Sequence, residues 1–128
     1  MDSNVLLDLF TDDPAWAPWS EARLAEAFDA GQVVINPIVY AEISVAFARI
    51  ETLQAALPQQ LGREGLPWEA AFLAGKCFVE YRRRGGARRS PLPDFYIGAH
   101  AAVTGRALLT RDADRYQTLL PGLTLICP

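Results

Sequence analysis

Apolar residues recur along the chain with two spacings, one typical of amphipathic helices and one typical of short buried strands. In one helical segment Trp19, Leu24 and Phe28 fall near the same face, and Gly31 marks the end of the segment. The helical spacing predicts helices over residues 4–10, 13–31, 37–53, 67–84 and from Pro93 onward. Short apolar runs predict strands at residues 32–35, 107–110 and 123–126, with a polar turn at 111–116.

The predicted strands alternate with helices and are uniformly apolar, which indicates a parallel sheet covered by helices on both faces. The predicted fold class is therefore α/β. A length of 128 residues, 51% of them hydrophobic, fits one domain over residues 1–128 that buries roughly two-thirds of its unfolded surface. Polar residues interrupt the apolar stretches and no basic leader opens the chain, so we expect a cytoplasmic protein with no membrane contact.

The charge pattern places one basic patch on an otherwise acidic chain. The net charge is −3, yet five of the twelve basic residues lie between Arg82 and Arg89. Cations in the last turn of a helix before Gly85 suit a helix C-terminus, and this accounts for Arg82 to Arg84. Arg88 and Arg89 lie beyond the glycines, and they are candidates to bind phosphate groups.

Acidic residues stand where a parallel α/β sheet binds its ligands, beyond the carboxyl ends of the strands. Asp112 follows the strand at 107–110, and Asp94 opens the helix that precedes this strand. Asp2 comes before the first helix, where a first strand would end. Asp94 also has a purely structural explanation, because Pro93 suits a first helical position and the helix dipole favours a carboxylate beside it.

Glu42 fits a structural explanation least well, because its neighbours in "VYAEISVAF" are almost all apolar. A buried carboxylate must be paired, hydrogen-bonded or bound to a cation, and no basic residue lies three or four positions away. Several carboxylates that converge without His or Cys form a hard oxygen site of the kind that Mg²⁺ or Mn²⁺ occupies. His100, which lies between small residues, is expected to be a packed and hydrogen-bonded side chain.

Three blocks of the sequence resemble a known family when taken in order. The blocks are "DSNVLLDLF", "PIVYAEIS" and "LPDFYIGAHAAVTGRALLTRDADRY", and together they span nearly the whole chain. They look like the PIN domain, and within it the VapC toxins of bacterial toxin–antitoxin pairs. The last block is the most specific, with an Asp that opens an Ala-rich helix and an apolar strand that ends in Thr-x-Asp. In the family a short apolar strand precedes the first aspartate, whereas here Met1 alone precedes Asp2.

The resemblance implies a Rossmann-like three-layer sandwich with a short central parallel sheet and a metal-dependent ribonuclease site. It assigns catalysis and the binding of Mg²⁺ or Mn²⁺ to four acidic residues: Asp2, Glu42, Asp94 and Asp112. Ser3, Asn4 and Thr110 match polar positions around the family's site, and Asp114 either shares a metal contact or is a solvated turn residue. Next to such a site, Arg88 and Arg89 are expected to hold RNA phosphates.

The function predicted on this basis is that of a VapC-like toxin, a Mg/Mn-dependent ribonuclease that hydrolyses RNA phosphodiester bonds. The resemblance also implies a homodimer and inhibition by a cognate VapB-like antitoxin. The alternative is a PIN-fold protein that has lost turnover and binds RNA or a partner protein. A receiver domain fits poorly because the only lysine, Lys76, lies inside a predicted helix, and a dehalogenase-type phosphatase would need Asp-x-Asp where "DSNV" stands.

Overall fold

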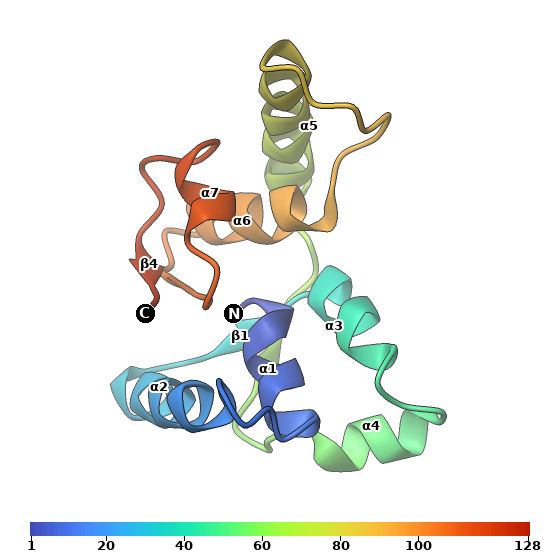
Figure 1. Ribbon diagram of the computed structural model, residues 1–128, viewed down its shortest axis with the longest axis vertical. Helices are drawn as coiled ribbons and strands as arrows, with labels where there is room; N and C mark the ends of the chain where they lie inside the picture. The colour runs from blue at the N-terminus through green and yellow to red at the C-terminus, as the bar shows by residue number, and fades with distance from the viewer.

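The computed structural model describes residues 1–128, and short strands alternate with helices along the chain (Figure 1). The elements of the first half are α1 (Ser3–Phe10), α2 (Ala17–Ala30), β1 (Val34–Ile35), α3 (Pro37–Ser44), α4 (Ile50–Ala56) and β2 (Gly62–Arg63). Those of the second half are α5 (Trp68–Arg83), α6 (Pro93–Val103), β3 (Leu108–Leu109), α7 (Asp114–Gln117) and β4 (Leu125–Ile126). The predicted α/β class is confirmed.

The strands form two small parallel sheets, β1 with β2 and β3 with β4. The first residues of the chain lie between these sheets. The amino group of Met1 donates a hydrogen bond of 3.1 Å to the Val34 carbonyl on β1. The Asp2 amide donates one of 2.9 Å to the Leu109 carbonyl on β3. These two bonds place the Asp2 side chain at the ends of β1 and β3.

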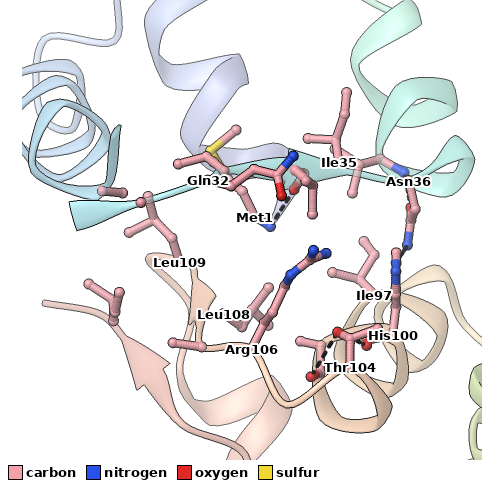
Figure 2. A pocket seen from close by; sticks show the side chains of 18 of the residues that line it. Met1, Gln32, Ile35, Asn36, Ile97, His100, Thr104, Arg106, Leu108 and Leu109 are labelled. Carbon is pink, nitrogen blue, oxygen red and sulfur yellow. Dashed lines mark hydrogen bonds between the residues drawn. The ribbon is translucent and has the colours of Figure 1, made fainter. Parts of the chain in front are cut away.

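A cavity of about 250 Å³ lies beside Met1, between the edges of the two sheets (Figure 2). Its lining is mostly apolar, and the side chain of Arg106 projects into it. Near the cavity, Glu64 accepts hydrogen bonds from Arg106 at 2.5 Å and from His100 Nε2 at 3.0 Å. His100 Nδ1 lies 3.0 Å from the Asn36 amide nitrogen, so this histidine is packed and hydrogen-bonded as expected.

The buried apolar side chains form two clusters. The larger one contains residues from both sheets and from helices α1, α2, α3, α4, α6 and α7. The smaller one lies between α5 and α6, where Ala70, Ala74 and Ala99 allow the two helices to pack closely. None of the helices combines the length and the apolar composition that crossing a membrane would require.

The structure corrects the sequence prediction at three elements. The helix predicted over 37–53 is wrong in its middle, because α3 ends at Ser44 and α4 begins only at Ile50. Ser44 donates a hydrogen bond of 2.7 Å to the Tyr40 carbonyl, and the intervening segment brings Phe47 edge-on against Phe10 of α1, with ring centroids 5.0 Å apart. The polar turn at 111–116 contains the short helix α7, and β2 was not predicted.

Candidate active site

The site lies where four separate parts of the chain meet. Asp2 is the N-cap of α1, and Glu42 lies on the last turn of α3. Asp94 is the second residue of α6, directly after Pro93. Asp112 follows β3 and precedes α7. The predicted acidic residues therefore come from elements that are distant in sequence.

Asp2 is the innermost carboxylate, and its side chain is 3% exposed. Its Oδ1 accepts a hydrogen bond of 2.7 Å from the Ser3 amide, which caps α1. Its Oδ2 accepts bonds from the hydroxyls of Thr110 and Tyr116, both at 2.8 Å, and from the Asn4 amide group at 3.2 Å. A buried charge needs this many donors, and they hold Asp2 in one orientation.

Thr110 ties the first and last parts of the site together. It is completely buried at the end of β3, and its hydroxyl donates to Asp2 while it accepts bonds from the Asn4 side chain at 3.2 Å and the Asp112 amide at 3.1 Å. The Asn4 side-chain oxygen in turn accepts a bond of 3.4 Å from the Arg111 amide. This network positions the loop that carries Asp112.

Glu42 joins the site through Ser3. The Ser3 hydroxyl donates a hydrogen bond of 2.9 Å to Glu42 Oε1. Burial raises the pKa of the Glu42 carboxyl above its usual value, the bond from Ser3 opposes this rise, and the charges of Asp2 and Asp94 add to it. The partner of Glu42, which the sequence alone did not identify, is therefore the Ser3 hydroxyl. The negative charges of Asp2 and Asp94 also act on the Glu42 carboxyl.

Asp94 and Asp112 share one cation, the guanidinium of Arg115. Arg115 Nη1 lies 3.2 Å from Asp94 Oδ2, and Arg115 Nε lies 2.6 Å from Asp112 Oδ2. Burial raises the pKa of Asp94, the charge of Asp2 adds to the rise, and Arg115 opposes it. Burial is therefore the main cause of the raised pKa of both Glu42 and Asp94, and the charges of neighbouring acids add to it.

An open cleft of about 720 Å³ leads to these acidic side chains. Glu42 and Asp94 line it together with three arginines, Arg84, Arg88 and Arg115. Arg84 is held by Glu80 at 2.8 Å and donates to the Thr118 carbonyl at 3.1 Å. Of the two arginines predicted to hold phosphates, Arg88 borders the cleft, whereas Arg89 is exposed and lies outside its lining. Asp114 also lines the cleft, with an exposed side chain on the first turn of α7.

The donor set fits a divalent cation in its chemistry. Its acidic side chains are carboxylates, the hard oxygen donors that Mg²⁺ and Mn²⁺ prefer, and the charge of Asp2 adds to the raised pKa of Glu42 and of Asp94. As the side chains stand, no three acidic, histidine or cysteine residues lie close enough to hold one ion together. Two of the four acids are engaged by Arg115 and one is surrounded by hydrogen-bond donors.

Sequence analysis did not single out three residues of this site, Arg84, Arg115 and Tyr116. Tyr116 is 2% exposed, and its pKa is raised by burial and by the charge of Asp2, so its hydroxyl stays protonated and donates to Asp2. A signal was present for Arg115, because it stands three residues after Asp112, the spacing of neighbours on a helical turn. It was overlooked because the segment was predicted to be a turn.

Comparisons with known proteins agree with the fold. A family model described as the PIN domain matches residues 1–118. The fold is similar to VapBC2 from Rickettsia felis, solved bound to a DNA fragment from its promoter, with 19% identity, a TM-score of 0.74 and coverage of 98% of this chain and 94% of that one. It is also similar to a toxin–antitoxin complex from Klebsiella pneumoniae, with 22% identity, a TM-score of 0.65 and coverage of 98% and 92%. No curated protein matched the sequence.

Proposed function

Because the chain belongs to the PIN domain family, whose members are in general nucleases, we propose that it is a metal-dependent ribonuclease that hydrolyses RNA phosphodiester bonds. One observation carries the proposal: four carboxylates from distant elements are linked in pairs through Ser3 and Arg115, and two of them, Glu42 and Asp94, line a cleft that arginines border. The cleft has no histidine in its lining, and the Ser3 hydroxyl is engaged by Glu42, so the acidic residues suit hydrolysis by metal-activated water.

The proposed metal ligands are Asp2, Glu42, Asp94 and Asp112. A Mg²⁺ or Mn²⁺ ion held by them would supply an activated water and neutralise charge on the phosphate. The protein's own contribution is to hold the carboxylates in place. The donors on Asp2 Oδ2 leave its Oδ1 as the less crowded oxygen. Thr110 and Ser3 orient Asp2 from opposite sides and connect it to Asp112 and Glu42.

The cleft is the proposed path of the RNA strand. Arg88 and Arg84 border it on the side of the C-terminal end of α5, and a guanidinium binds phosphate oxygens through paired N–H donors. The chain as a whole carries a net charge of −3, so this local patch rather than the overall charge has to attract the substrate. Arg89, which is exposed on the same loop, could reach only a phosphate outside the cleft.

The proposal is tested by incubating purified chain with total tRNA and rRNA in Mn²⁺, in Mg²⁺ and in EDTA. We expect cutting only with metal. Asp94→Asn should lower the rate about a hundredfold or more, the scale of losing a group that stabilises transition-state charge. Asp29→Asn, which removes the same charge from the exposed face of α2, serves as the matched control and should cut normally. Cutting that persists in EDTA, or in Asp94→Asn, would refute the assignment, and RNA binding without cutting would favour an inactive PIN-fold protein.

We also propose that the protein is a toxin with two protein partners. One is a VapB-like antitoxin, and the other is a second copy of the chain. The similarity to two toxin–antitoxin complexes supports the antitoxin. An exposed apolar stripe on α5, made by Trp68, Phe72 and Val79, which are 88%, 68% and 49% exposed, supports the dimer. A monomer in light scattering at micromolar concentration would remove the dimer. Failure of the neighbouring gene's product to inhibit cutting would remove the antitoxin.

A further inference from the structure

Arg115 has a position that the proposed reaction does not by itself explain. It lies on α7, which packs beside α6 (Figure 1), and its guanidinium bridges two elements that both carry proposed metal ligands. One nitrogen contacts Asp94 on α6, and another contacts Asp112 on the loop after β3. Neither acid forms an ion pair with any other basic side chain. The side chain is 58% exposed and borders the cleft.

The contacts of Arg115 use the oxygens that a metal ion would need. Oδ2 of Asp94 and Oδ2 of Asp112 both face the guanidinium, at 3.2 and 2.6 Å. A divalent cation bound to the same oxygens would be repelled by the positive charge on Arg115 at this distance. The ion and the guanidinium would therefore compete for these two oxygens.

We propose that Arg115 is an internal counter-cation that competes with the divalent metal ion for Asp94 and Asp112. In the metal-free protein it holds the two carboxylates together across α6 and the β3–α7 loop, and the ion has to displace it. The displaced guanidinium stays beside the cleft, which Arg88 also lines. This inference deepens the proposed function and rests on it for the identity of the metal ligands, but it can be measured without any RNA.

The test is a calorimetric titration of the full chain with MnCl₂. The Arg115→Gln variant lacks this partly exposed competitor for the two carboxylates. It should bind Mn²⁺ about three- to tenfold more tightly than wild type. Arg115→Lys, whose ammonium is a point charge without the planar fork, should lie between wild type and Arg115→Gln. Arg49→Gln is the matched control, because Arg49 is 74% exposed and pairs only with Glu51. The proposal is overturned if Arg115→Gln binds Mn²⁺ no more tightly than wild type. It is also overturned if Arg49→Gln gains as much Mn²⁺ affinity as Arg115→Gln does.

Thermal unfolding separates this role from a merely structural one. In EDTA, Arg115→Gln should melt below wild type, because Asp94 and Asp112 lose their shared cation. In saturating Mn²⁺ this difference should vanish, whereas a purely structural role would leave it unchanged. The two proposals can also fail separately. Tighter Mn²⁺ binding in Arg115→Gln with no RNA cutting by any variant would refute the ribonuclease only, and metal-dependent cutting with unaltered Mn²⁺ affinity would refute the role of Arg115 only.

Discussion

Glu42 shows most directly how a single residue of this site can lower the stability of the metal-free fold. Its carboxyl is half-buried on α3, with one hydrogen bond from Ser3 and negative charge on Asp2 and Asp94 nearby. Burial and these charges raise the pKa of Glu42 in the folded protein. A group whose pKa is raised on folding stabilises the fold below its ordinary pKa and loses this contribution as the pH rises through the folded value. Ionised Glu42 therefore destabilises the metal-free protein at neutral pH.

Replacing Glu42 by Gln should consequently raise the stability of the metal-free protein at pH 7. Glutamine has nearly the same shape, and its side-chain oxygen can still accept the bond from Ser3. The advantage over wild type should shrink as the pH falls and be lost near pH 4, where the wild-type side chain is also neutral. Urea unfolding in EDTA across this pH range measures the difference. An advantage that stays constant with pH, or a variant less stable than wild type at pH 7, would contradict this account.

At the level of residues the acids were easier to predict than the groups that hold them. A carboxylate within an apolar segment, such as Glu42, is conspicuous in a sequence because it needs a partner. The roles of Asp2, Glu42, Asp94 and Asp112 stay predictions until the variants are measured, although the fold brings them around one site. Tyr116 is an ordinary core aromatic in the sequence, and only its distance of 2.8 Å from Asp2 shows what its hydroxyl does.

Among the elements, α3 depends most clearly on one side chain. Asn36 is its N-cap, and the Asn36 side-chain oxygen accepts a bond of 3.0 Å from the Val39 amide. The other end of the same amide group contacts His100, which is held by Glu64. One residue thus fixes the start of α3 and links it to α6. Because Glu42 is on α3, this cap also positions part of the proposed site.

Asn36→Ala should lower the free energy of unfolding by about 1–2 kcal/mol, the range for a lost cap with a buried hydrogen-bond partner. It should also lower the rate of RNA cutting, since α3 carries Glu42. Asn36→Asp, which keeps an oxygen for the Val39 amide but loses the donor to His100, separates the two contacts. Chemical denaturation gives the stabilities. A loss below about 0.3 kcal/mol in Asn36→Ala would show that the cap does not hold this helix.

The helices were largely predictable because their signals are local, and the failures have non-local causes. Pro37 and Pro93 stand at first helical positions in both the sequence pattern and the structure. In the break between α3 and α4, Phe47 packs against Phe10, a contact that no local pattern contains. β2 consists of Gly62 and Arg63, which have no strand propensity, and exists because β1 offers a parallel partner.

On the scale of the whole molecule, the strand order is the feature that assembles the site. β1 and β3 are both followed by site elements, and Met1 and Asp2 lie hydrogen-bonded between them. The carboxyl ends of parallel strands lie at the same edge of a sheet, where α/β proteins bind ligands. The α/β class, predicted from the alternation of strands and helices, therefore also indicated where ligand-binding residues should stand. That two short sheets form, rather than one, could not be predicted, since it depends on pairing between distant segments. The extent of the domain, residues 1–128, stays a prediction.

The measurement that tests the central claim most directly is the chemistry of the RNA ends that this protein leaves in Mn²⁺. If the chain cleaves RNA as its resemblance to the PIN family implies, water attacks phosphorus and the 3′ oxygen leaves, so the products should carry 5′-phosphates and 3′-hydroxyls. Ligation of an adapter that joins only to 5′-phosphates would recover these products without prior treatment with a kinase. Products with 5′-hydroxyls and 2′,3′-cyclic phosphates would mean that the RNA's own 2′-hydroxyl is the nucleophile, and they would contradict the account.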